Sequence, residues 1–342
     1  MGFNIKGGFK GKPKNKIGLD IGSSSVKILE ISRQGASPSI VSIGMKKVTG
    51  SARQDLVDAI KSLVEETKPR TTEANISVSG ASVSVRFVTM PKMRDEELKS
   101  AIRFEAEKYI PFAIKDCIVD YQILRKNDKD NKVDVVLVAV KKDLVLDRIS
   151  LIEECGLSVG VIDVDTFAVV NAYLENFPQE DPDKTVALLN IGSRFTNVGI
   201  VRGGSVRFVR DIAIGGYDFD QALAAAFNID VKGIEEIKIT PRDRMAEVMT
   251  YTRSIAGSLL DEVRLSFSYY ENQSGQGINE ICICGGSANL AGLGLSFEEA
   301  FEAQPHFLNP LRFLEKAKDL DSEFIEREKA SFAVAAGLAL RY

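Results

Sequence analysis

Hydrophobic residues recur along this chain with two different periods, and the periods alternate from one segment to the next. Val26 and Ile28 alternate with polar positions, as on a strand with one buried face. Leu56, Ile60 and Leu63 instead follow the spacing of an amphipathic helix. We expect strands over 16–21, 26–31, 75–90, 117–124, 133–140, 159–164, 185–190, 197–201, 206–210 and 281–284, and helices over 54–66, 94–110, 144–155 and 166–177. This mixture predicts an α/β fold.

One local pattern occurs twice. The run Leu-Asp-Ile-Gly-Ser at 19–23 returns as Leu-Asn-Ile-Gly-Ser at 189–193, and both runs join a strand to a returning strand. The two runs are 170 residues apart in a chain of 342. A repeat at half the chain length predicts two similar halves that face each other.

Glycine and serine at the tips of these two hairpins suit phosphate binding. Glycine lets a ligand approach the backbone, and serine hydroxyls and backbone N–H groups donate hydrogen bonds to phosphate oxygens. Asp20, at the end of the first strand, would hold a divalent ion beside the phosphates, usually through water. A third turn follows the strand 281–284, where Gly285 and Gly286 precede an expected helix start and suit packing against a purine or its ribose. By itself, that turn is equally consistent with a purely structural role.

Together the three motifs resemble the phosphate 1, phosphate 2 and adenosine motifs of the actin, Hsp70 and sugar-kinase superfamily. The resemblance implies a site for ATP or ADP with Mg²⁺. It assigns the first phosphate loop to Asp20, Gly22, Ser23, Ser24, Ser25 and Lys27, with Asp20 beside the metal, the second loop to Asn190, Gly192, Ser193 and Thr196, and the nucleoside contacts to Gly215, Gly216, Glu235, Lys238, Gly285, Gly286 and Ser287. The segment that holds Glu235 and Lys238 is also consistent with a solvated face of mixed charge.

The segment between the two hairpins resembles one branch of this superfamily. Met-Pro-Lys-Met at 90–93 and Glu-Ala-Glu-Lys-Tyr-Ile-Pro-Phe at 105–112 are similar to the PilM family, as are Asn309-Pro310 and the run 335–341. The resemblance covers nearly everything after residue 15 and implies an actin-like (ribonuclease H-like) fold of two lobes with an extra small subdomain of the FtsA and PilM type. The expected organisation is a flexible basic arm at 1–15, a first lobe at 16–82 and 159–180 with helices from 325–342, an inserted subdomain at 83–158, and a second lobe at 184–342 with a helical subdomain at about 220–275.

Membership of this family implies a cytoplasmic scaffold of type IV pilus assembly, recruited to the inner face of the inner membrane. Its expected partners are the N-terminal cytoplasmic peptide of a PilN-like membrane protein and other pilus machinery, and a homo-oligomer is possible. The surface around 94–111 is a candidate for part of the peptide groove, and its apolar face would also pack on the neighbouring sheet.

One position departs from the family. Its second phosphate loop usually begins with Asp-Ile-Gly, and here Asn190 replaces the aspartate. An amide can bond a water or a phosphate but lacks the charge that polarises water or helps to hold a metal. We therefore expect nucleotide binding with slow or absent hydrolysis, and no residue is named as the catalytic base.

Charge and composition exclude several other classes. The net charge of −4 does not favour nucleic acid as a partner. No apolar run reaches the roughly 18 residues of a membrane span, so we expect membrane association only through partners. Scattered cysteines and a single histidine, His306, do not form a metal or His-based catalytic motif.

Three alternative functions remain within the superfamily. An FtsA-like division protein would carry a C-terminal membrane-targeting helix, and a type II secretion scaffold would continue into a membrane span. A sugar or acid kinase would need a carboxylate base and larger substrate inserts.

Overall fold

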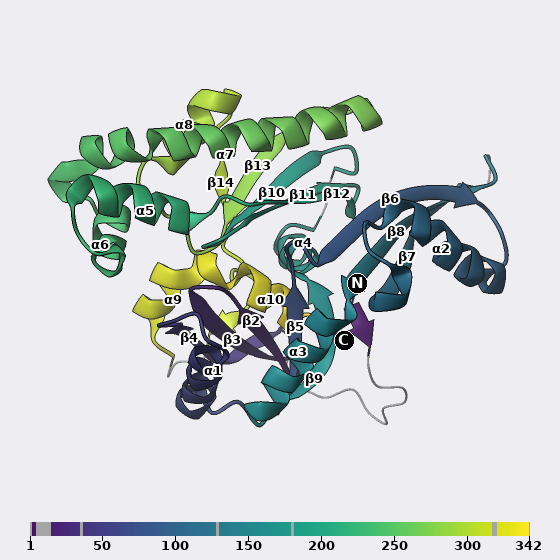
Figure 1. The fold of residues 1–342 in the computed structure, drawn as a ribbon, viewed down its shortest axis with the longest axis horizontal. Helices are drawn as coiled ribbons and strands as arrows, with labels where there is room; N and C mark the ends of the chain where they lie inside the picture. The colour runs from purple at the N-terminus through teal and green to yellow at the C-terminus, as the bar shows by residue number, and fades with distance from the viewer. Residues whose placement is uncertain are drawn as a thin grey trace.

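Three β-sheets form the frame of the molecule, and helices cover or separate them (Figure 1). The computed structural model describes residues 2–4, 15–34, 37–127, 130–178, 181–316 and 320–341. Most of the predicted basic arm therefore lies outside the described residues. Within the described ranges, no helix combines the length and the apolar character that crossing a bilayer requires.

The first lobe is built on a seven-stranded sheet with the order β1-β9-β5-β2-β3-β4-β15. Its strands are β1 (Gly2–Asn4), β2 (Asn15–Ile21), β3 (Ser25–Ser32), β4 (Ser39–Lys47), β5 (Glu73–Val78), β9 (Ser158–Val164) and β15 (Glu315–Lys316). β2 and β3 form the predicted hairpin, and β5 lies parallel to both β2 and β9. β1 pairs antiparallel with β9, so three residues of the arm expected to be flexible satisfy backbone groups at the sheet edge.

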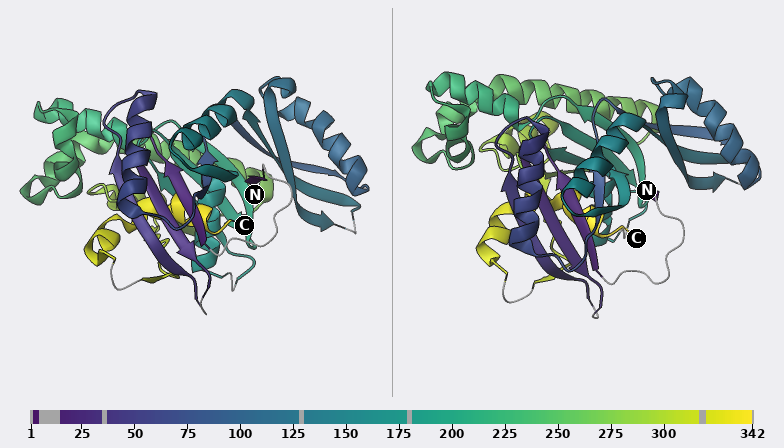
Figure 2. Two further views of the ribbon diagram at one scale, coloured as in Figure 1. Left: turned by 90° about the horizontal axis from the view of Figure 1, so that it is seen from below. Right: turned by 60° about the horizontal axis from the view of Figure 1, so that its bottom comes forward.

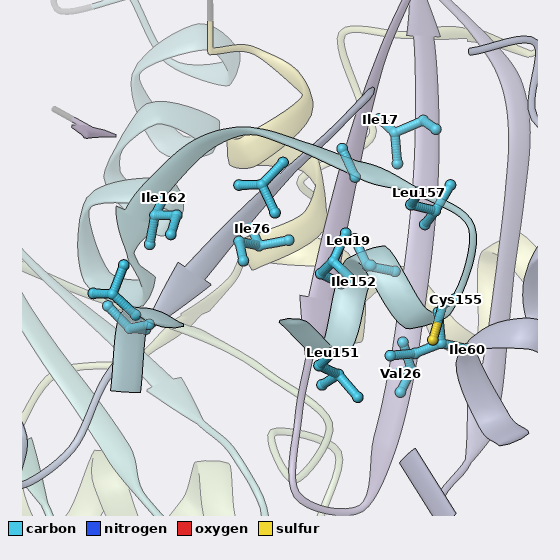
Figure 3. Close-up of a cluster of buried hydrophobic side chains, with 14 of the residues drawn as sticks. Ile17, Leu19, Val26, Ile60, Ile76, Leu151, Ile152, Cys155, Leu157 and Ile162 are labelled. Carbon is cyan, nitrogen blue, oxygen red and sulfur yellow. The ribbon is translucent and has the colours of Figure 1, made fainter. Parts of the chain in front are cut away.

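Helices α1 (Arg53–Thr67) and α3 (Lys142–Glu154) share one hydrophobic core with this sheet (Figure 3). Leu19 from β2, Ile60 from α1 and Ile152 from α3 are all completely buried there. We expected α3 within the inserted subdomain. Its buried residues Leu151 and Ile152 belong to a core that contains residues of this sheet and also Val138 of the insert, so α3 packs where the insert meets the first lobe.

The second lobe contains a five-stranded sheet with the order β12-β11-β10-β13-β14. Its strands are β10 (Thr185–Ile191), β11 (Thr196–Arg202), β12 (Ser205–Ile212), β13 (Glu280–Cys284) and β14 (His306–Phe307). The long helix α7 (Met245–Ser274) and the shorter α8 (Leu293–Phe301) share a core with this sheet. Helices α5 (Gly216–Phe227) and α6 (Ile234–Ile239) form a small cluster at one end of α7 (Figure 1).

Two helices separate the sheets of the two lobes. Helix α4 (Asp165–Asn176) and helix α10 (Ala333–Ala339) contribute to the cores on both sides, and α9 (Ser322–Glu328) precedes α10. They approach so closely that a Cβ atom on Gly337 would lie 1.7 Å from the carbonyl oxygen of Ala168. The central helices therefore tie the two lobes into one body.

The inserted sheet has the order β6-β8-β7 and projects from one side of the molecule (Figure 2). Its elements are β6 (Val83–Pro91), α2 (Asp95–Tyr109), β7 (Cys117–Asn127) and β8 (Lys132–Lys141). Leu98, Ile102 and Ala106 of α2 pack on one face of this sheet, as their helical spacing predicts. The continuous strand expected over 75–90 is interrupted at 79–82, where the chain leaves the first lobe and enters the insert.

Short 3₁₀ helices complete the described structure: Ile114–Asp116, Val231–Gly233, Arg242–Arg244 and Lys329–Phe332. The four cysteines are free and buried, so they serve as small residues of the core.

Candidate functional site

The first hairpin brings an acidic and a basic side chain together near its tip. Asp20 on β2 lies directly opposite Lys27 on β3, and the carboxylate is 3.1 Å from the Lys27 Nζ atom. Both residues are buried, so the pair is shielded from solvent. At the tip, the Gly22 N–H donates to the Ser25 carbonyl oxygen at 3.1 Å.

The serines of this tip differ in exposure. Ser23 and Ser24 are exposed, whereas Ser25 is buried at the start of β3. The Ser24 carbonyl oxygen accepts a hydrogen bond from Val48, just beyond β4, at 2.9 Å. The backbone of the tip is thus fixed while two hydroxyls remain available to a ligand.

The second hairpin repeats this geometry in the other lobe. The Gly192 N–H donates to the Phe195 carbonyl oxygen at 2.9 Å, as Gly22 does to Ser25. Thr196 is fully buried, and its hydroxyl donates to the Ile214 carbonyl oxygen at 2.8 Å. That hydroxyl holds the hairpin to the segment before α5, and Ser193 is the more accessible of the two predicted hydroxyls.

Three predicted segments meet at the second hairpin. The carbonyl oxygen of Gly192 accepts hydrogen bonds from the Gly216 N–H at 2.9 Å and from the Ser287 hydroxyl at 3.1 Å. Gly215 and Gly216 begin α5, where a Cβ on Gly216 would lie 2.0 Å from the Ser287 Oγ atom. The close approach of α5 to this turn therefore depends on the absence of a side chain at 216.

The turn after β13 requires glycine at one of its two positions. Gly285 has φ of +99°, and a Cβ there would lie 2.5 Å from the Ile191 carbonyl oxygen. At Gly286, a Cβ would have only the Ser331 Oγ atom nearby, at 3.6 Å. The helix start expected directly after these glycines is absent, because residues 286–289 form turns and α8 begins at Leu293.

Glu235 and Lys238 lie on α6 as predicted, in different environments. Lys238 is buried, with its Nζ atom 2.7 Å from Asp220 on α5 and 3.6 Å from Glu235. Its carbonyl oxygen accepts a hydrogen bond from Ala291, beyond the Gly285 turn. The ammonium group thus ties α6 to α5, and the Glu235 side chain retains about half its exposure.

Asp165, at the start of α4, is a further candidate site residue, which the sequence motifs did not include. Burial raises its pKa to about 6, and the charges of Asp20 and Asp211 raise it as well, while hydrogen bonds with Ser77 and Ser79 lower it in part. One of the two neighbouring carboxylates comes from each lobe, so Asp165 lies between the lobes. The available signal was an acidic residue directly after the predicted strand 159–164, at the beginning of a predicted helix.

Asn190 is held by a second missed residue, Asn197. The Asn190 Nδ2 atom donates to Asn197 Oδ1 at 2.8 Å, and Asn197 Nδ2 donates to Asp211 Oδ1 at 2.7 Å. The amide that replaces the family's aspartate is therefore part of a buried chain of side chains. Among the described residues, no three His, Cys, Asp or Glu side chains form a metal site by themselves.

Asn190→Asp is expected to lower the melting temperature at pH 8, because the new carboxylate has no proton to donate to Asn197 Oδ1. Leaving these buried groups unsatisfied costs about 1–3 kcal/mol. Burial would raise the pKa of the new carboxyl in the folded state, so the deficit grows as pH rises above the unfolded pKa of about 4 and is small below it. Thermal unfolding of both proteins at pH 4 and pH 8 measures this difference. Equal melting temperatures at pH 8 would show that the Asn190–Asn197 bond contributes little.

Comparison with known proteins identifies the family and the fold. The family model described as type IV pilus assembly protein PilM matches residues 18–342. A solved PilM–PilN type IV pilus biogenesis complex aligns with a TM-score of 0.85 and 28% identity, over 95% of this chain and 98% of that chain.

More distant relatives share the fold. The ethanolamine utilization protein EutJ of Carboxydothermus hydrogenoformans aligns with a TM-score of 0.58 and 14% identity, over 96% of this chain and 90% of its own. EutJ of Escherichia coli K12 is 26% identical over 50% of this chain, and the cell division protein FtsA of Staphylococcus epidermidis is 21% identical over 65%. The matches span 58% and 53% of the lengths of those two curated proteins. With a family match over nearly its whole length, this chain belongs to the PilM family of type IV pilus assembly proteins and has their actin-like fold.

Proposed function

We propose that this protein is an ATP-binding scaffold of type IV pilus assembly that captures the N-terminal cytoplasmic peptide of a PilN-like membrane protein. The observation that carries the nucleotide half is the pair of glycine-tipped hairpins, one from each lobe, with Asp165 between them. Backbone N–H groups and free serine hydroxyls at such tips are donors for phosphate oxygens. The turn at Gly285 and Gly286 adjoins the second tip, and Gly286 is exposed there, where the nucleoside would pack.

The residues fit a Mg²⁺ ion that arrives with the nucleotide. Mg²⁺ keeps several waters and is usually held by one or two carboxylates together with substrate phosphates. Asp20 would provide that carboxylate through water, and Lys27 beside it would offset the charge of the phosphates. When bound, the ion would neutralise phosphate charge.

Hydrolysis is proposed to be slow. Asn190 carries no charge, and its amide already donates to Asn197, so it is poorly suited to activate water. Asp165 is held by Ser77 and Ser79 and can accept a hydrogen bond from a water, although its raised pKa leaves it partly protonated near pH 6. We expect turnover well below about 1 per second, the lower range of ordinary enzymes.

The nucleotide proposal is tested by titrating the protein with Mg-ATP. Asp20→Asn is expected to weaken binding by roughly tenfold, about 1.4 kcal/mol, because it removes the carboxylate proposed to hold the hydrated metal. Asp58→Asn, an exposed change on α1, is the matched control and should bind like the unsubstituted protein. Failure of the unsubstituted protein to bind Mg-ATP or Mg-ADP would reject the nucleotide half of the proposal.

The partner half is supported by the PilM–PilN complex as a neighbour and by the surface of α2. Leu98 and Ile102 pack on the sheet, whereas Phe104 is 66% and Tyr109 is 44% exposed on the same helix. Exposed aromatic side chains beside a sheet suit an extended peptide that seats side chains in pockets. Recruitment to the membrane would follow from this capture.

A further inference from the structure

The chain enters the inserted subdomain through a turn at 79–82, here called the hinge, and the insert also shares part of the first lobe's core through Val85 and Val138. β5 ends at Val78 and β6 begins at Val83, while β8 returns to the same place, since Lys141 donates to the Ser82 carbonyl oxygen at 3.1 Å. Gly80 lies in the middle of the turn with φ of +84°, a conformation that favours glycine. The turn therefore lies where the strands that lead into and out of the insert meet the first lobe.

A side chain of the second lobe accepts a hydrogen bond from this hinge. The Gly80 N–H donates to Asp211 Oδ2 at 2.7 Å, and Asp211 itself lies on β12. The other carboxylate oxygen accepts from Asn197, which in turn accepts from Asn190 at the start of the second nucleotide loop. An unbroken chain of hydrogen bonds thus runs from that loop to the hinge.

A second contact follows the same route. Phe195, at the tip of the second hairpin, has ring atoms 3.8 and 3.9 Å from where a Cβ of Gly80 would lie. On the other side of the turn, Ser77 and Ser79 hydrogen-bond Asp165 in the nucleotide site. The hinge is therefore in contact with site residues from both lobes.

Contacts of this kind can couple the nucleotide site to the peptide site by a measurable amount. Hydrogen bonds to a charged carboxylate are stronger than those between neutral groups, and coupling between two binding sites typically changes affinity by about 5–150-fold. Phosphates entering between the hairpins would change the field at Asp165 and Asp211 and would contact the loop that begins at Asn190. A purely structural Asp211 would stabilise the fold without linking the two binding events.

We propose that Asp211 is a positioning residue that couples nucleotide occupancy at the second phosphate loop to the setting of the inserted subdomain, and so to its affinity for the partner peptide. This inference rests on the proposed function. It requires that the Gly80 turn has two conformations and that both the nucleotide and the peptide bind one of them more tightly than the other. By linkage, the peptide then changes the affinity for ATP by the same factor as ATP changes the affinity for the peptide.

The test is a four-way binding cycle on the full chain. A synthetic peptide copying the N-terminal cytoplasmic segment of the PilN-like protein from the same genome is titrated with and without Mg-ATP, into the unsubstituted protein and into Asp211→Asn. The substitution keeps the size of the side chain but replaces one accepting oxygen with an NH₂ group. The hydrogen bond from either Gly80 or Asn197 is then lost, because two donors face each other. We expect Mg-ATP to change peptide affinity by at least roughly fivefold in the unsubstituted protein and by less than about twofold in the variant.

Two further variants separate coupling from stability. Phe195→Leu removes the ring next to Gly80 and should also reduce the effect of Mg-ATP on peptide affinity. This variant replaces Asp211→Asn in the test if Asp211→Asn does not fold. Asp261→Asn, on the exposed side of α7, should leave the ratio unchanged. The inference is overturned if Mg-ATP changes peptide affinity by the same factor in Asp211→Asn and Phe195→Leu as in the unsubstituted protein. It is also overturned if the unsubstituted protein binds both ligands but its peptide affinity does not depend on ATP. Absence of ATP binding would instead reject the proposed function.

Discussion

Gly285→Ala is expected to lower the free energy of unfolding by roughly 3 kcal/mol. A side chain at φ of +99° is strained, which costs about 1–3 kcal/mol. The new methyl group would also lie 2.5 Å from the Ile191 carbonyl oxygen and 2.6 Å from Asn190 Oδ1, so β10 or the turn must move. Overpacking of this kind adds about 1–3 kcal/mol. Urea unfolding of the variant and the unsubstituted protein measures the difference.

Gly286→Ala is the matched control in the same turn. Its methyl group would have only Ser331 Oγ nearby, at 3.6 Å, so stability should change little. If a nucleoside packs on Gly286, however, this variant should bind Mg-ATP more weakly although it folds normally. Unchanged ATP affinity in a stable Gly286→Ala variant would place the nucleoside elsewhere, and an equally stable Gly285→Ala variant would contradict the close packing at Ile191.

Asp165→Asn is expected to stabilise the ligand-free protein at pH 8 by about 2 kcal/mol. The folded pKa of about 6 exceeds the unfolded value of about 3.9, and a difference of one pKa unit corresponds to about 1.4 kcal/mol. The expected effect is reduced to about 2 kcal/mol because Asp165 is half-buried and solvent screens part of its charge. Ionised Asp165 therefore destabilises the folded state above pH 6, beside Asp20 and Asp211. The amide lacks that charge and can still accept from Ser77 and Ser79.

The stability gained by Asp165→Asn should depend on pH. Because the pKa of Asp165 is raised on folding, the contribution of this residue to stability falls as pH rises from about 4 to 6. Below pH 4 both states are protonated, so the advantage of Asp165→Asn should disappear. Melting temperatures of the two proteins at pH 4, 6 and 8 test this, with Asp58→Asn as a control expected to show no such trend. A variant less stable than the unsubstituted protein at pH 8 would mean that the Asp165 charge is stabilised by the fold.

Local patterns predicted the two hairpins because each lies within one short segment. Asp20, Gly22 and Gly192 are set by a strand, a turn and a returning strand, which alternation and glycine spacing reveal. The helical period of 94–110 likewise predicted α2 and its packing face. Similarity to PilM, carried by 90–112, was confirmed by the family match.

Contacts between distant segments were beyond these patterns. Asp211 reaches Gly80 across 131 residues, and no periodic signal links a strand end to a turn in another lobe. Strand β4 was missed because its buried face consists of Ile40, Ser42 and Gly44, of which only Ile40 is strongly hydrophobic. The hydroxyl of Thr196 was expected to contact phosphate. Its burial and its hydrogen bond to Ile214 depend on tertiary packing, which the local sequence does not reveal.

The central claim is tested most directly by isothermal titration calorimetry of the unsubstituted protein with the PilN-like N-terminal peptide in the presence of Mg-ATP. A scrambled peptide of the same composition is the control. We expect saturable binding with a Kd of about 10 μM or tighter, and no binding of the scrambled sequence. A protein that binds Mg-ATP but not the peptide, with or without nucleotide, would contradict its role as a pilus scaffold that captures this partner.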